Sequence, residues 1–176
     1  MENLDRRIRQ QVLSIVRPRG KKHLRPWHGA PTVSRVLVGV NSQIAVWRPY
    51  PGASAIRDIA LHITYFENAV ANKLSGADLP VEFDLRKRGW PVVCDAVEET
   101  QWRAERRYME ATHERLAEAV RSFDPRKLDQ VASEKAGMTV MEYIHGVVDH
   151  TLYHTAELKL LKTLAKLALE QETSAV

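Results

Sequence analysis

The sequence is poor in the features that disulfide-bonded and membrane proteins depend on. Cys94 is its single cysteine, which excludes a disulfide within the chain. No apolar run approaches the roughly 20 residues that a membrane-spanning helix needs. Residues 1–11 are polar and lack the apolar core of a secretory signal peptide. We therefore expect a cytoplasmic protein that does not enter a membrane.

Glycine and proline are also scarce, with eight of each among 176 residues, and most of them fall between predicted helices. The apolar fraction is 44% and the charged fraction 27%, which is the composition of an ordinary globular protein. A chain of this length suits one domain with a hydrophobic core.

The formal net charge of +4 is unevenly distributed along the chain. Residues 1–25 contain eight Lys and Arg residues against two acidic ones, whereas the remainder carries 18 basic and 20 acidic residues. The basic segment contains no Trp, Tyr or Phe on which a base could stack. We therefore do not favour nucleic acid as a partner.

Apolar residues at spacings of three and four predict four long helices, over residues 31–47, 55–74, 92–123 and 139–169. Ser54 and Thr139 are candidate N-caps, and Gly76 is a stop signal. Residues 1–16 could add a short helix. No segment predicts a strand, so the expected fold is all-α: an antiparallel four-helix bundle in which the connection over residues 77–91 is long enough for a crossover.

The spacing of the histidines is more informative than the charge. His150 and His154 are four residues apart in the last predicted helix, so they lie on one face, one turn apart. Such a pair can bind one transition metal. His62, in the second predicted helix, could complete three imidazoles if the two helices are neighbours. Three neutral nitrogen ligands with open positions are typical of a catalytic metal site.

Two carboxylates share these helix faces. Glu157 follows His154 by three residues and could be a fourth ligand, a base or a hydrogen-bond acceptor. Asp58 precedes His62 by four residues and could orient its ring. For each residue a role without the metal is an equal alternative. Glu157 would then be a solvated helix residue, and Asp58 would belong to the charge pattern of a first helical turn.

The other histidines and the cysteine are weaker candidates. His145 is about 140° away from His150 around the helix and is expected to pack or to face solvent. His113 lies in a charged stretch and is expected to be exposed, and His23 and His28 adjoin the basic segment. Cys94 falls near the predicted start of the third helix, but no histidine is close to it in sequence, so we do not favour it as a nucleophile.

Three segments resemble the DinB-like superfamily, also called the DinB/YfiT-like metalloenzymes. They are WHGAP at Trp27–Pro31, RPYPGASAIRDIALHITYFE at Arg48–Glu67 and YIHGVVDHTLYHTAELKLLK at Tyr143–Lys162. The resemblance covers roughly residues 27–169. It divides the chain into a basic N-terminal extension (1–26), a DinB-like helical bundle domain (27–170) and a frayed tail (171–176).

The resemblance implies a four-helix bundle, often a homodimer, with a divalent metal held by three histidines. Carried over to this sequence, the ligands are His62, His150 and His154, and zinc, nickel, manganese and iron are all compatible metals. Ala156 and Glu157 stand where the family usually has Gly and Gln. These departures narrow the space near the site and add a negative charge.

Characterised relatives include thiol S-transferases and isomerases that use a low-molecular-weight thiol. We therefore predict a metal-dependent enzyme with a small-molecule substrate, in which the metal activates a thiol (S-transferase-like) or water (hydrolase-like). Thiol transfer is modestly favoured, and Glu157 is the candidate catalytic residue. The alternative is a non-enzymatic, dimeric metal-binding protein of the stress response.

Overall fold

The computed structural model describes residues 6–7, 32–133 and 136–174. The described part is mostly helical, as predicted. Its long helices are α4 (Ile56–Ser75), α5 (Glu99–Ser122) and α6 (Val140–Ser174). Its short ones are α2 (Val33–Val36), α3 (Ser42–Val46) and the 3-10 turns η2 (Lys87–Gly89) and η3 (Pro125–Lys127). The predicted helix over 1–16 lies outside the described residues, apart from residues 6–7.

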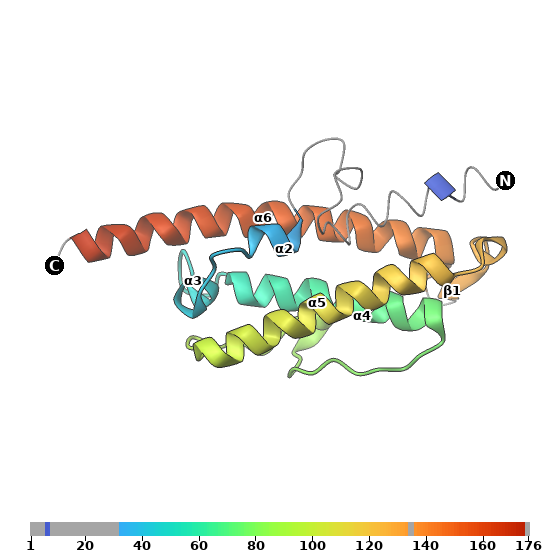
Figure 1. The fold of residues 1–176 in the computed structure, drawn as a ribbon, viewed down its shortest axis with the longest axis horizontal. Helices are drawn as coiled ribbons and strands as arrows, with labels where there is room; N and C mark the ends of the chain where they lie inside the picture. The colour runs from blue at the N-terminus through green and yellow to red at the C-terminus, as the bar shows by residue number, and fades with distance from the viewer. Residues whose placement is uncertain (1–5, 8–31, 134–135, 175–176) are drawn as a thin grey trace.

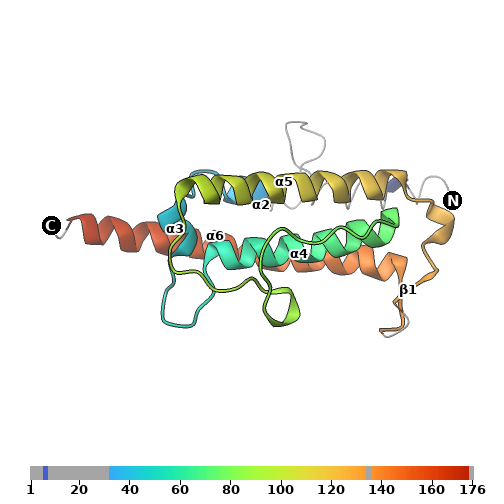
Figure 2. The same ribbon diagram turned by 90° about the horizontal axis from the view of Figure 1, so that it is seen from below.

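The connection between α4 and α5 determines the direction of the helices. Residues 76–98 run back along the length of the bundle, so α5 starts at the same end as α4 and runs parallel to it (Figures 1 and 2). Helix α6 runs in the opposite direction and packs against α4 and α2. The predicted crossover is therefore present.

The first predicted long helix is interrupted and forms α2 and α3 instead. Gly39 follows α2 with a φ of 72°, in the left-handed region that residues with a Cβ rarely adopt. The Asn41 side chain then accepts a hydrogen bond of 3.0 Å from the Ile44 N–H and starts α3. The described residues therefore contain three long helices with two short ones beside them, not the four long ones predicted.

Helix α4 begins and ends at local signals. Ala55 is the N-cap, which corrects the prediction of Ser54. A hydroxyl is not needed there, because the Asp58 carboxylate one turn on accepts a 3.0 Å hydrogen bond from the Ala55 N–H. Gly76 ends the helix in the left-handed conformation, as predicted.

Helix α5 begins at Glu99, seven residues later than predicted. The chain before it folds back on itself: Leu85 and Pro91 form an antiparallel bridge, and the Val92 N–H donates to the Asp84 carbonyl over 2.9 Å. Cys94 therefore precedes the helix instead of lying at its first turn, and its Sγ contacts the carbonyl oxygen of Ala96.

A short hairpin joins α5 to α6, which corrects the prediction of no strands. Strands β1 (Val131–Ser133) and β2 (Met138–Thr139) pair antiparallel. Thr139 is the N-cap of α6, as predicted: its Oγ1 accepts from the Glu142 N–H over 3.2 Å, and the Glu142 carboxylate accepts from the Thr139 N–H over 2.7 Å. Helix α6 continues to Ser174, five residues beyond its predicted end.

The core consists of two apolar clusters arranged along the bundle. One contains Ile59, Trp102 and Leu158, and the other contains Leu116 and Val147. The middle of α4 and the middle of α6 meet between them, where the candidate site lies. Within the described part of the chain, no helix combines the length and apolar character needed to cross a bilayer.

Candidate metal centre

Three of the seven histidines come together between α4 and α6. One ring nitrogen from each of His62, His150 and His154 lies within 4.8 Å of the other two. The Nε2 atoms of His62 and His150 are 3.3 Å apart, and the ring centroids of His150 and His154 are 4.4 Å apart. The structure thus brings together the three residues predicted as ligands, because α4 and α6 are neighbours.

The loop that contains η2 holds His62 on the side away from the cluster. His62 Nδ1 is 3.1 Å from the Gly89 carbonyl oxygen. A carbonyl oxygen can only accept, so Nδ1 carries the proton and Nε2 keeps its lone pair. The Trp90 side chain stacks on the His62 ring with centroids 3.9 Å apart and planes 7° from parallel. The ring therefore has a defined orientation and tautomer.

Asp58 does not orient His62; of the two roles considered from the sequence, the one in the first turn of the helix is observed. Its fully buried carboxylate accepts hydrogen bonds from Arg48 Nη1 over 2.5 Å and from the Ala55 N–H over 3.0 Å. These partners lie in the chain that leads into α4. Asp58 consequently fixes the start of the helix, and the Gly89 carbonyl is the group that orients the His62 ring.

Glu157 contacts the third histidine. Its Oε2 is 2.5 Å from His154 Nδ1, which makes it a hydrogen-bond acceptor, one of the three roles considered from the sequence. This contact leaves Nε2 of His154 available to the cluster. Glu157 also accepts a hydrogen bond from the Tyr153 hydroxyl, which raises the pKa of Tyr153. The carboxylate therefore links a metal-ligand candidate to a tyrosine that is 64% exposed.

Two imidazoles of the cluster, His62 and His150, are held uncharged. Burial lowers the pKa of His62, although the Gly89 carbonyl partly opposes this shift. Burial, followed by repulsion from His154 and His62, lowers the pKa of His150 to about 4. Both rings are therefore neutral at pH 7, which is the form that binds a metal.

One distance in the cluster matches the spacing of the ligands of a transition metal. A tetrahedral site with metal–nitrogen distances of about 2.0–2.1 Å separates its ligand nitrogens by about 3.3–3.4 Å. The observed 3.3 Å between the Nε2 atoms of His62 and His150 agrees with this spacing. Three imidazoles without a thiolate suit zinc, iron, nickel or copper. These three residues could hold such an ion.

The remaining histidines lie away from this cluster or outside the described residues. His145 is exposed on α6, as predicted. His113 is buried, which corrects the prediction of an exposed side chain, and it forms an ion pair with the fully buried Glu67 of α4. Burial by itself lowers the pKa of His113, but the Glu67 carboxylate reverses this effect and the pKa is raised. His23 and His28 lie outside the described residues.

A comparison with family models identifies the family of this chain. The model of the DinB superfamily matches residues 31–158. The chain belongs to the DinB superfamily. This DinB match begins just before α2 and ends one residue after Glu157, so it includes the three clustered histidines. No curated protein matches the chain significantly.

Sequence reasoning missed the residues that support His62. Gly89 and Trp90 lie in a segment predicted as a plain connection, and Phe66, whose ring centroid is 4.5 Å from that of His150, was not among the candidate site residues. The one available signal was Gly-Trp-Pro at residues 89–91, where glycine permits a φ of 74°. Nothing local in this DinB sequence indicates that the loop reaches back to α4.

Proposed function

We propose that the chain is a metal-dependent enzyme whose metal is held by His62, His150 and His154. The observation that carries the proposal is the convergence of three imidazoles, two of them with Nδ1 already hydrogen-bonded by the protein. A structural zinc site normally has four protein ligands, whereas three are typical of a catalytic one.

The ligand set suits activation of a weakly acidic group. A divalent metal with three neutral ligands keeps its full charge and lowers the pKa of a thiol or water that binds it. The protein contributes orientation: the Gly89 carbonyl and the Glu157 carboxylate hold protons at Nδ1 of His62 and His154. His150 is the least buried of the three, so we propose that substrate approaches from its side.

We favour transfer of a low-molecular-weight thiol to a small-molecule substrate over hydrolysis, because the chain resembles superfamily members that use such thiols. In this proposal Glu157 is a positioning residue: it accepts a hydrogen bond from His154 Nδ1 and takes no proton in the reaction. Its link to the exposed Tyr153 hydroxyl extends this network toward solvent.

A homodimer is also proposed. Leu160 and Leu164 are exposed apolar side chains one turn apart on α6. Light scattering coupled to size exclusion would measure the mass in solution. A monomer at micromolar concentration would contradict this part of the proposal.

Metal analysis and activity together test the function. We expect about one equivalent of metal in the purified protein, and a loss of most of it in His62→Ala, His150→Ala and His154→Ala. His145→Ala is the matched control, since His145 lies on the same helix but outside the cluster. Less than about a tenth of an equivalent in the wild type and no effect of His150→Ala would contradict the proposal.

Reaction class requires a separate measurement. Conjugation of a low-molecular-weight thiol to model electrophiles and hydrolysis of model amides and esters would be assayed with the metal-loaded protein. Thiol transfer that disappears in His150→Ala but persists in His145→Ala supports our preference. Full metal occupancy with neither activity would favour the non-enzymatic alternative.

A further inference from the structure

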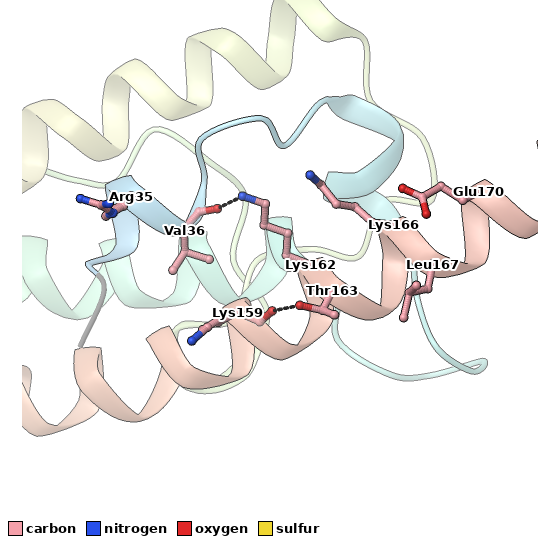
Figure 3. A pocket seen from close by; sticks show the side chains of 8 residues that line it. All are labelled: Arg35, Val36, Lys159, Lys162, Thr163, Lys166, Leu167 and Glu170. Atoms are coloured by element: carbon pink, nitrogen blue, oxygen red, sulfur yellow. Dashed lines mark hydrogen bonds between the residues drawn. The ribbon is translucent and has the colours of Figure 1, made fainter. Parts of the chain in front are cut away.

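A groove with an excess of positive charge lies between α2 and the C-terminal half of α6. Its volume is about 630 Å³, and it is lined by Arg35, Val36, Lys159, Lys162, Thr163, Lys166, Leu167 and Glu170 (Figure 3). This volume lies within the roughly 300–1,000 Å³ of typical small-molecule sites. Lys162 is eight residues, or about 12 Å of helix, beyond His154. The groove is therefore separate from the metal centre.

Four cations face this groove against one carboxylate. Arg35 comes from α2, and the three lysines repeat at spacings of three and four along α6, so they share one side of it. Among the described residues, no carboxylate lies within ion-pair distance of these four side chains, and Glu170 lies at the end of the groove away from Arg35 (Figure 3). The described lining of the groove therefore carries a net positive charge.

Lys162 is held inside the groove by the protein. Its Nζ donates hydrogen bonds to the Val36 and Val38 carbonyl oxygens, which ties the end of α2 to α6. Burial, followed by repulsion from Lys166 and from Arg106 of α5, lowers its pKa. A fixed ammonium group with further cations beside it is a favourable place for an anion with several charges.

The spacing of the cations indicates the kind of anion. Lys159 and Lys166 are seven residues apart, so their Cα atoms are separated by about 10.5 Å along the helix. A chain of phosphates can contact every lysine of such a row at once, which a single carboxylate or sulfate matches less well. The planar guanidinium of Arg35 suits two-point binding of a phosphate. The Leu167 and Glu170 end is less positive and suits an uncharged organic group.

We propose that this groove binds a small polyphosphate-bearing molecule, with its phosphates along Arg35, Lys159, Lys162 and Lys166. The ligand is either a nucleotide-like compound or a free polyphosphate chain. Its binding does not depend on the metal centre.

Titration calorimetry of the full-length, metal-free protein tests the proposal, with inorganic tripolyphosphate and ATP as separate probes. Metal-free protein is required because polyphosphates themselves bind divalent cations. We expect saturable 1:1 binding that weakens with salt, and an affinity lowered about tenfold or more in the double variant Lys159→Gln/Lys166→Gln, because two charge-assisted contacts are lost. Tighter binding of ATP than of tripolyphosphate would identify a nucleotide-like ligand, and the reverse a free polyphosphate.

Two control variants separate the groove from general basic charge. Lys73→Gln/Lys127→Gln removes two exposed lysines elsewhere, and Arg17→Gln/Arg19→Gln/Lys21→Gln/Lys22→Gln removes four of the eight cations of the N-terminal basic segment. Both should bind as the wild type does, and circular dichroism would confirm that every variant is folded. An equal loss of affinity in either control overturns the proposal, as does wild-type affinity in the groove variant. Binding to anionic phospholipid vesicles without binding of either probe overturns it as well.

Discussion

Replacement of Gly89 by alanine is the most direct way to test how the site is built. Gly89 has a φ of 74°, and its carbonyl oxygen accepts the hydrogen bond from His62 Nδ1. A Cβ at this position would lie 2.9 Å from Cγ of Tyr65 and closer still to two other atoms of that ring. These are atoms of a ring attached to α4, so either the ring or the loop must move, and the Gly89 carbonyl moves with the loop.

The size of the effect follows from the contact that is lost. Removal of a hydrogen-bond partner behind a metal-binding histidine typically weakens metal affinity 10- to 100-fold. This corresponds to about 1.4–2.7 kcal/mol. A residue with a Cβ in the left-handed conformation costs roughly a further 1–2 kcal/mol of folding stability, independently of the metal.

Gly76→Ala is the matched control. Gly76 has nearly the same φ, 73°, but no atom lies within 4 Å of its hypothetical Cβ, and it is at the far end of α4 from the loop. Both variants carry the backbone strain, and only Gly89→Ala disturbs His62. Zinc affinity would be measured by competition with a chromophoric chelator. At a zinc concentration 100 times the wild-type Kd, a tenfold loss of affinity reduces the metal-dependent stabilisation from about 2.7 to about 1.4 kcal/mol.

The contrast between the two glycines decides the outcome. Wild-type zinc affinity in Gly89→Ala would show that the Gly89 carbonyl does not hold His62 in its ligating form. Equal loss of zinc affinity in Gly76→Ala would show that general destabilisation, and not the Tyr65 overlap, is responsible.

Three further predictions concern titratable side chains. Glu157→Ala should weaken zinc binding about tenfold, and Glu157→Gln much less, since the amide oxygen still accepts from His154 Nδ1. The chelator titration measures the zinc affinity of both variants. Equal losses of affinity would mean that the charge of Glu157 matters more than its orientation of the ring. The pKa of His113 is raised above its ordinary 6.5, so its pairing with Glu67 stabilises the fold fully below pH 6.5 and less as pH rises further. Urea unfolding between pH 6 and 9 should therefore show a falling free energy of unfolding in the wild type, and no such fall in His113→Gln. The pKa of His150 is lowered to about 4, so the metal-free protein should lose stability as pH falls from about 6.5 to 4, and a His150→Gln variant with an unchanged acid slope would contradict this assignment.

Local sequence rules predicted the helices well and their interruptions less well. The apolar spacing placed α4 and α6 almost to the residue at their N-terminal ends, and Thr139 and Gly76 acted as the cap and the stop that their types favour. The apolar spacing did not predict the break at Gly39, because the period of three and four continues through it. The φ of 72° at Gly39 nevertheless ends the helix there. The late start of α5 was not predicted for a related reason. Residues 92–98 are compatible with a helix, but the bridge between Leu85 and Pro91 directs the chain just before them.

Errors about individual side chains have one common cause, which is that their partners are distant in sequence. Asp58 was considered as a partner of His62 because they share a helix face, with a first-turn role as the equal alternative, and its partner Arg48 comes from the preceding loop. His113 was predicted to be exposed because its sequence neighbours are charged, yet a buried carboxylate on α4 receives it. The residues next to Asp58 and His113 in the sequence do not indicate that Arg48 and Glu67 are their partners.

By itself, the sequence determined that the chain is helical and that His150 and His154 share one face of a helix, since both follow from the 3.6-residue period of a single helix. It also carried the superfamily resemblance that the family comparison supports. Only the tertiary structure decided that His62 meets this pair, that Gly89 and Trp90 define its ring, and that four cations face one groove between α2 and α6. These contacts join residues that are tens of positions apart, so they depend on the path of the connections and on the packing of whole helices.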